Sequence, residues 1–166
     1  IGLEPHNWVT AWVAITDSNE ENGCMRMLSG SHKGNLKKHT QMFNSGNLLT
    51  RGQTISNIPK EKTKPIILKA GQMSLHHPTV IHGSDLNKSN DRRIGFVIQS
   101  YIGTNVKQVL GKNSVQLARG IDKFNFHKKI GRPNSLMNEN DLKLKEEENN
   151  NLQQIFYKGS PKKGVY

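Results

Sequence analysis

The stretch from residue 76 to residue 93 combines side chains that suit metal and carboxylate binding. His82 follows an apolar run, Ser84 lies two positions later, and Arg93 lies eleven positions after the histidine. A neutral imidazole is a common ligand for first-row metals, and an arginine presents a rigid fork of donors to a carboxylate. If His82 ends one strand and Arg93 begins the next, both side chains can point into one cavity. The spacing therefore allows a metal ligand and a carboxylate clamp in the same site, and a structural role for His82 is the alternative.

The elements that must position these residues have the pattern of an antiparallel β protein. Residues 8–16 are β-branched, aromatic and small, with apolar side chains on both faces, which is typical of a central strand. Further short strands are predicted between turn residues, at 24–28, 66–68, 73–77, 79–82 and 93–102. No helical pattern separates these strands, as a parallel α/β sheet would require. The sequence therefore predicts a mainly β sandwich or barrel.

Basic residues are concentrated in two segments of a chain whose net charge is +11. Residues 33–65 are polar and basic without a clear period, so we expect a long functional or mobile loop. Residues 33–69 hold eight Lys and Arg against one acidic residue, and residues 103–133 hold seven against one. The basic surface is either plain solvated surface or a means of steering an anionic substrate. Aromatic residues are not interleaved with these lysines, which argues against a nucleic-acid partner.

The C-terminal part of the chain has a different character. Residues 138–157 are rich in Glu, Lys, Leu and Gln and predict a helix, with Asn138 or Asn140 as its cap. We therefore expect a β core over residues 1–103 and a C-terminal extension over residues 104–166.

Cellular context is indicated by the single cysteine and by the absence of long apolar runs. Cys24 cannot form an internal disulfide, which suits a reducing compartment such as the cytoplasm. No apolar run approaches the roughly 18 residues of a membrane span, so no membrane association is expected. The start at Ile1 lacks an initiator Met and a signal-peptide layout, and it has the character of the middle of a longer sequence. The sequence does not indicate an oligomeric state.

Several motifs, taken in order, resemble one enzyme family. The main match is His77-Pro78-Thr79-Val80-Ile81-His82-Gly83-Ser84 followed by Arg93. Supporting matches are Ala11 to Ile15, Glu21 to Arg26, Ser29 to His32 and Ala70 to Met73. Together they resemble the phytanoyl-CoA dioxygenase family of Fe(II)- and 2-oxoglutarate-dependent oxygenases over residues 1 to about 103. The resemblance implies a double-stranded β-helix, which is a cupin-like jelly roll.

The resemblance also assigns roles to individual residues. His82 would be the distal iron ligand, and Arg93 would bind the far carboxylate of 2-oxoglutarate, with Arg92 as the fallback on the opposite face. Ser84 would assist Arg93, and Trp12 would line the co-substrate pocket. Arg119 is a weaker substrate-binding candidate, for which a plain surface position is an equal alternative. No further catalytic residue is assigned.

One departure from the family pattern affects the metal site. The other two iron ligands of the family come from a His-x-Asp motif shortly before the strand that carries Trp12, and this sequence contains no such motif. We expect that the motif lies upstream of Ile1 and that the chain alone is inactive. Residues 1–103 would then form an N-terminally truncated oxygenase core.

The expected activity is hydroxylation of a small, anionic or neutral substrate with Fe(II), 2-oxoglutarate and O2. Two alternatives stay open. A non-haem iron halogenase of the same family would carry alanine or glycine in place of the missing aspartate. A non-catalytic cupin-like binding module would carry neither the second histidine nor the aspartate.

Overall fold

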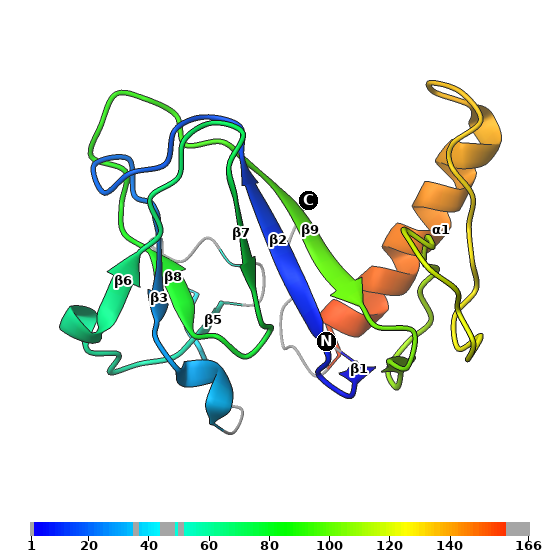
Figure 1. Ribbon diagram of the computed structural model, residues 1–166, viewed down its shortest axis with the longest axis horizontal. Helices are drawn as coiled ribbons and strands as arrows, with labels where there is room; N and C mark the ends of the chain where they lie inside the picture. The colour runs from blue at the N-terminus through cyan, green and yellow to red at the C-terminus, as the bar shows by residue number, and fades with distance from the viewer. Residues whose placement is uncertain (1, 35–36, 44–48, 50–51, 159–166) are drawn as a thin grey trace. The chain divides into compact units, whose positions relative to one another are not determined.

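The computed structural model describes residues 2–34, 37–43, 49 and 52–158 (Figure 1). The chain divides into two compact units. One unit comprises Ile1–Asn7, Thr40–Thr54 and Gly103–Tyr166, and the other comprises Trp8–His39 and Ile55–Ile102. The second of these units contains the residues of the sequence-predicted site other than Arg119. The division into an oxygenase core and a C-terminal extension stays a prediction.

The first sheet of this site-bearing unit is antiparallel, with the order β7-β2-β9. It consists of β7 (Met73–His76), β2 (Trp8–Ala14) and β9 (Gly95–Ile102). The prediction that the segment beginning at Trp8 is a central strand is therefore confirmed, although β2 ends two residues early. Its small residues Ala11 and Ala14 are almost fully buried, which lets the chain pack closely on both sides.

The second sheet is also antiparallel, with the order β6-β3-β8. It consists of β6 (Thr63–Pro65), β3 (Met25–Leu28) and β8 (His82–Ser84). The prediction that residues 79–82 continue as a strand was wrong, because the chain turns at Pro78 and Thr79 and the Val80 N–H donates to the His77 carbonyl over 3.0 Å. Residue 82 therefore begins a strand and does not end one.

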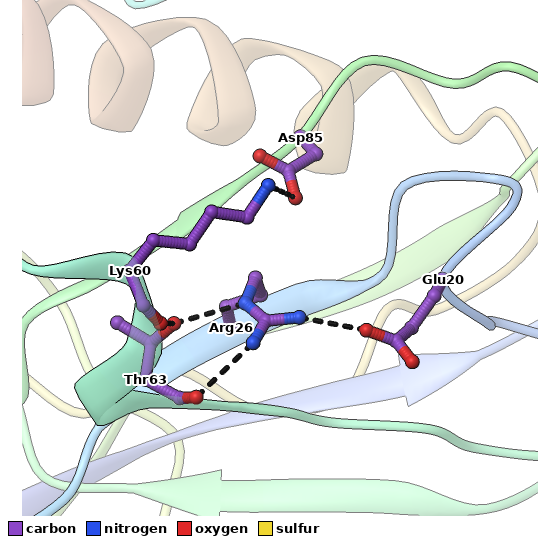
Figure 2. A network of polar contacts seen from close by, with 5 residues as sticks. All are labelled: Glu20, Arg26, Lys60, Thr63 and Asp85. Atoms are coloured by element: carbon purple, nitrogen blue, oxygen red, sulfur yellow. Dashed lines mark hydrogen bonds and ion pairs between the residues drawn. The ribbon is translucent and has the colours of Figure 1, made fainter.

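A polar network on β3 ties this second sheet together (Figure 2). Arg26 Nε donates to Thr63 Oγ1 over 2.9 Å, and Arg26 Nη2 donates to the Thr63 carbonyl over 3.1 Å. Its Nη1 pairs with Glu20 over 2.8 Å, and nearby Lys60 pairs with Asp85 over 2.7 Å. The network joins β3 to β6 and to the turn before β3. It therefore supports the sheet that carries His82 and Ser84 on β8.

The two sheets lie beside each other in Figure 1 and are linked at their ends. Residue 18, after β2, forms an antiparallel bridge with residue 68, after β6. Cys24 is buried just ahead of β3, and this burial raises the pKa of its thiol. The arrangement confirms a mainly antiparallel β fold of the jelly-roll type. The bridge at residue 68 replaces the strand predicted over 66–68.

The other unit holds two strand pairs and one helix in its described part. They are the paired strands β1 (Leu3–Glu4) and β10 (Lys107–Gln108), the paired strands β4 (Thr40–Gln41) and β5 (Gln53–Thr54), and the helix α1 (Glu139–Phe156). The predicted helix is confirmed, with the Asn138 side chain accepting from two N–H groups of its first turn. Ile155 is the buried residue of this helix.

The segment predicted as one long loop over residues 33–65 is more structured than expected. Within its described residues it contains β4, β5 and β6, and the short 3-10 helix η2 (Lys60–Lys62); a similar helix, η1 (Ser31–Lys33), ends where the segment begins. Residues 35–36, 44–48 and 50–51 of the prediction lie outside the described residues.

Over the described parts of the chain, no helix combines the length and apolar character that crossing a membrane requires.

Candidate functional site

His82 is held in one tautomer by the turn that precedes β8. Its Nδ1 lies 2.8 Å from the Val80 carbonyl oxygen, which can only accept, so Nδ1 carries the proton. In the neutral ring the lone pair is therefore on Nε2. A ligating histidine commonly donates its other N–H to a backbone carbonyl in this way. His82 is thus set to present Nε2 to a metal ion.

Ser84 connects the histidine to the predicted carboxylate clamp. Because alternate side chains of a strand share a face, Ser84 projects from the same face of β8 as His82. Arg93 Nη2 donates to Ser84 Oγ over 3.3 Å. The side chains expected to work together are therefore brought together, but not on neighbouring strands. β8 belongs to one sheet, and Arg93 lies just before β9 of the other sheet.

Trp12 completes the surroundings of the guanidinium. The Arg93 guanidinium carbon lies 5.5 Å from the centre of the Trp12 ring, within the range of a cation–π contact. A Cβ atom at Gly95 would overlap the Trp12 indole, so only glycine leaves room for the ring there. Gly95 was not anticipated as a site residue, because its role is visible only in the packing of β9 on β2.

The backbone around Arg93 is fixed by Thr16, two residues after β2. Thr16 Oγ1 donates to the Arg92 carbonyl and accepts from the Ile94 N–H, each over 2.9 Å. One hydroxyl therefore holds the peptide groups on both sides of Arg93. Nothing in the sequence pattern singled out this threonine.

His76 is the third functional candidate that the sequence did not reveal. It is the last residue of β7, is 8% exposed, and its ring centre lies 5.2 Å from that of His82. Burial, and secondarily the nearby His82, lower the pKa of His76. Thr10 pairs with His76 across the sheet, and alternation puts Trp12 on the same face. His76 therefore projects from the sheet face that carries Trp12.

Three other predicted residues lie apart from this cluster. Arg92 is exposed, whereas Arg93 is half-buried, which favours Arg93 as the clamp. His77, a residue of the family motif, accepts a hydrogen bond at Nδ1 from the Thr79 N–H over 3.3 Å. Arg119 is exposed and belongs to the other compact unit. Its substrate role stays a prediction.

The side chains present fit 2-oxoglutarate better than they fit a complete iron site. Arg93 offers donors to a carboxylate, next to a serine hydroxyl and an indole. His82 offers one imidazole nitrogen, but the described residues contain no group of three or more His, Cys, Asp or Glu side chains able to hold a metal ion. The described side chains therefore include donors suited to a carboxylate and one imidazole suited to a metal ion, and both roles stay predictions.

Comparisons with known proteins identify similar sequences. The family model for phytanoyl-CoA dioxygenase (PhyH) matches residues 3–95. The peroxisomal phytanoyl-CoA dioxygenase of Homo sapiens is 33% identical over 86 residues, which cover 51% of this chain and 25% of the human protein. A probable alpha-ketoglutarate-dependent hypophosphite dioxygenase of Stutzerimonas stutzeri is 27% identical over 112 residues, covering 64% of this chain and 39% of that protein.

A solved structure extends the similarity to the fold. The apo form of ThoJ, a non-heme monooxygenase, superposes with a TM-score of 0.79 at 29% identity, covering 95% of this chain and 56% of that chain. Its nickel complex gives a TM-score of 0.73 at 25% identity. The match to the human enzyme spans about a quarter of that enzyme's length. Because the family model covers more than half of the sequence, the chain belongs to the phytanoyl-CoA dioxygenase family.

Proposed function

We propose that this chain carries the 2-oxoglutarate clamp and one metal ligand of an Fe(II)- and 2-oxoglutarate-dependent oxygenase. The observation that carries the proposal is the Arg93 guanidinium, which lies against the Trp12 ring and donates to Ser84 Oγ. Ser84 shares its strand face with His82, so the clamp and the metal ligand project toward one site. Membership of the phytanoyl-CoA dioxygenase family and similarity to the probable alpha-ketoglutarate-dependent dioxygenase of Stutzerimonas stutzeri support this assignment.

In this proposal each side chain has a separate task. Arg93 binds the far carboxylate of 2-oxoglutarate through its fork of N–H donors, and Ser84 fixes the guanidinium plane. Trp12 covers one side of the guanidinium and limits its exposure to water. The Val80 carbonyl keeps the His82 ring in the tautomer that leaves Nε2 free for iron.

Iron and 2-oxoglutarate would supply the oxidising chemistry when bound. The balanced reaction consumes 2-oxoglutarate, O2 and a substrate C–H group, and it yields succinate, CO2 and the corresponding alcohol. We propose hydroxylation of a small molecule, with chlorination of the same C–H position as the alternative. Product mass in the presence of chloride separates the two, because hydroxylation adds one oxygen and chlorination replaces hydrogen by chlorine.

Ligand-observed NMR on the 166-residue chain tests the clamp directly. Saturation transfer from the protein to 2-oxoglutarate should be clear for the wild type and strongly reduced for Arg93→Gln. Arg92→Gln is the matched control and should behave as the wild type, because Arg92 is exposed beside the clamp. Equal transfer in the wild type and Arg93→Gln would overturn the clamp assignment.

A second experiment tests the metal ligand. In a protein that also supplies the His-x-Asp ligands, anaerobic addition of Fe(II) and 2-oxoglutarate should give a weak visible charge-transfer band if the co-substrate chelates bound iron. The band should be lost in His82→Ala. Binding of 2-oxoglutarate through Arg93 without any band would instead support the non-catalytic binding module.

A further inference from the structure

Two strands from different sheets present polar side chains beside one another. His82 and Ser84 share one face of β8. Ser74 and His76 likewise share one face of β7. The two strands approach each other at their histidines, whose ring centres lie 5.2 Å apart. Ser74, farther along β7, is the cross-strand partner of Trp12. The polar row on β7 therefore extends from the proposed metal ligand to the indole of the proposed clamp.

Arg93 closes these contacts into a circuit. Its guanidinium donates to Ser84 Oγ over 3.3 Å and lies 5.5 Å from the centre of the Trp12 ring. All members of the circuit belong to one compact unit. The members on β8, on β2 and before β9 have roles in the proposed function, whereas the two on β7 have none. In order of contact, the members of this clamp circuit are His82, His76, Ser74, Trp12, Arg93 and Ser84.

The two β7 members of the circuit have unmet polar atoms. Ser74 Oγ and His76 Nδ1 are buried and have no hydrogen-bond partner within the described part of the chain. His76 as a whole is only 8% exposed. By contrast, His82 Nδ1 lies 2.8 Å from the Val80 carbonyl oxygen. Because buried polar atoms in native proteins are nearly always hydrogen-bonded, the two β7 atoms require a partner that the described chain does not supply.

The placement of the two atoms indicates the chemistry of that partner. Residues two apart on an extended strand are separated by about 6.8 Å. The two carboxylate carbons of an extended five-carbon diacid are about 5 Å apart, given C–C bonds of about 1.5 Å, and their oxygens extend farther. A carboxylate accepts strongly from a hydroxyl and from an imidazole N–H. One 2-oxoglutarate molecule between Arg93 and His82 would therefore have a carboxylate within reach of each β7 side chain.

We propose that Ser74 and His76 bind 2-oxoglutarate, with Ser74 Oγ donating to the far carboxylate and His76 Nδ1 donating to the carboxylate beside the keto group. This inference rests on the proposed function, because it takes Arg93 as the clamp for the far carboxylate. Ser74 serves the Arg93 end because it pairs with Trp12, and His76 serves the other end because its ring lies against His82. Both would add to the clamp residues that the family resemblance does not assign.

Two probes separate the two ends of the co-substrate. 2-Oxopentanoate has the five-carbon chain and the keto acid of 2-oxoglutarate, but it lacks the far carboxylate. Saturation-transfer titrations of the 166-residue chain give a dissociation constant for each probe. Ser74→Ala should raise that of 2-oxoglutarate about tenfold and leave that of 2-oxopentanoate within about twofold. His76→Leu should weaken both probes by about tenfold.

Matched variants distinguish hydrogen bonding from a structural effect. His76→Asn should restore most of the affinity lost in His76→Leu, because the asparagine amide can donate from about the position of Nδ1. Ser18→Ala is the control for Ser74→Ala and should leave both probes within about twofold of the wild type. Ser18 Oγ is also buried without a described partner, but Ser18 lies at the bridge to residue 68, outside the clamp circuit.

A readout on the wild type does not depend on the folding of any variant. Long-range 1H–15N spectra of the labelled chain separate Nδ1 from Nε2 in every histidine. Both probes should shift the Nδ1 signal of His76. An unchanged Nδ1 signal at saturating 2-oxoglutarate would overturn the role of His76 and would indicate that water satisfies this nitrogen.

The remaining outcomes distinguish this inference from the proposed function. If Arg93→Gln weakens 2-oxoglutarate but Ser74→Ala and His76→Leu bind it as the wild type does, the β7 residues do not bind it and the clamp stands. Equal losses in Ser74→Ala and Ser18→Ala, or equal losses of both probes in Ser74→Ala, would overturn the role of Ser74. If Arg93→Gln also binds as the wild type does, the clamp and the β7 assignment are both overturned.

Discussion

At the scale of single residues, the clamp depends on a glycine that touches no ligand. We predict that Gly95→Ala weakens 2-oxoglutarate binding, because the added methyl group would overlap the Trp12 indole and displace it from Arg93. Cation–π contacts contribute about 0.5–2 kcal/mol, so the dissociation constant should rise about 2- to 30-fold.

Tryptophan emission and calorimetric titration with 2-oxoglutarate check the effect of Gly95→Ala. Gly131→Ala is the matched control, because a Cβ there meets nothing within 4 Å. Unchanged emission and unchanged 2-oxoglutarate affinity in Gly95→Ala would show that the indole does not depend on this glycine. Trp12→Phe assigns the emission change to Trp12 and not to Trp8.

Thr16 gives a second prediction at this scale. In Thr16→Val the hydroxyl that holds the Arg92 carbonyl and the Ile94 N–H is lost. Each hydrogen bond contributes about 0.5–1.5 kcal/mol, and part of that loss should appear as a 2- to 10-fold weaker affinity, by rough estimate, for 2-oxoglutarate. Thr10→Val is the comparison, because it removes the hydroxyl that Thr10, on β2, donates to the Gln99 carbonyl. If Thr16→Val weakens 2-oxoglutarate binding no more than Thr10→Val does, the two hydrogen bonds of Thr16 do not position Arg93.

The sequence was sufficient to select most of the cluster but not all of it. His82, Ser84 and Arg93 have side chains whose chemistry suits a metal ion and a carboxylate, whereas Trp12 was assigned through the family resemblance. The structure places Arg93 against Ser84 and Trp12. His76, Gly95 and Thr16 act through contacts between strands. Alternation along a strand puts His76 and His77 on opposite faces, but it does not by itself say which face points inward. That choice depends on how β7 pairs with β2, which is a tertiary property.

At the scale of elements, β6 and the turn before β3 are held by Arg26 (Figure 2). We predict that Arg26→Met lowers the free energy of unfolding by about 1–3 kcal/mol, because it removes the hydrogen bonds to Thr63 and the ion pair with Glu20. The Arg26 side chain is only 18% exposed, so water does not easily replace these partners. Urea denaturation measures the change.

Lys60→Met is the matched control for Arg26→Met. The Lys60–Asp85 pair is short, but its side chains are 67% and 45% exposed, and such pairs contribute about 0–1 kcal/mol. We therefore expect a change within about 0.5 kcal/mol for Lys60→Met. If Arg26→Met costs no more than Lys60→Met, the Arg26 network does not stabilise the sheet.

Element types were easier to predict than element ends. The central strand and the late helix have patterns that extend over many residues, and both are present. The segment 79–82 has strand-like residues, but the turn at Pro78 and Thr79 interrupts it. Because proline cannot donate to a strand ladder, Pro78 indicates that the strand is interrupted, but it does not indicate over how many residues. The start of β8 at His82 therefore required the pairing with β3.

At the scale of the whole molecule, stability should depend on acid conditions through three aspartates. Hydrogen bonds from Lys69 and the Ala70 N–H lower the pKa of Asp17, and Lys60 lowers that of Asp85. In the other unit, Lys129 and backbone N–H groups lower the pKa of Asp122. Asp17 and Asp85 link segments that are distant in sequence, and Asp122 holds a local turn. Ionisation of these carboxylates therefore affects the stability of both units.

The sign of the pH effect follows from these directions. A carboxyl whose pKa is lowered below its ordinary 3.8 binds protons less readily in the folded chain than in the unfolded chain. The stabilisation is therefore fully present above the unfolded pKa and is lost as pH falls through the lower, folded pKa. We predict a melting temperature that is flat from pH 7 to about pH 5 and falls below about pH 4. Asp17→Asn should reduce the drop below pH 4 while lowering stability at pH 7. A drop of equal size in Asp17→Asn and the wild type would show that this carboxylate is not one of the groups responsible.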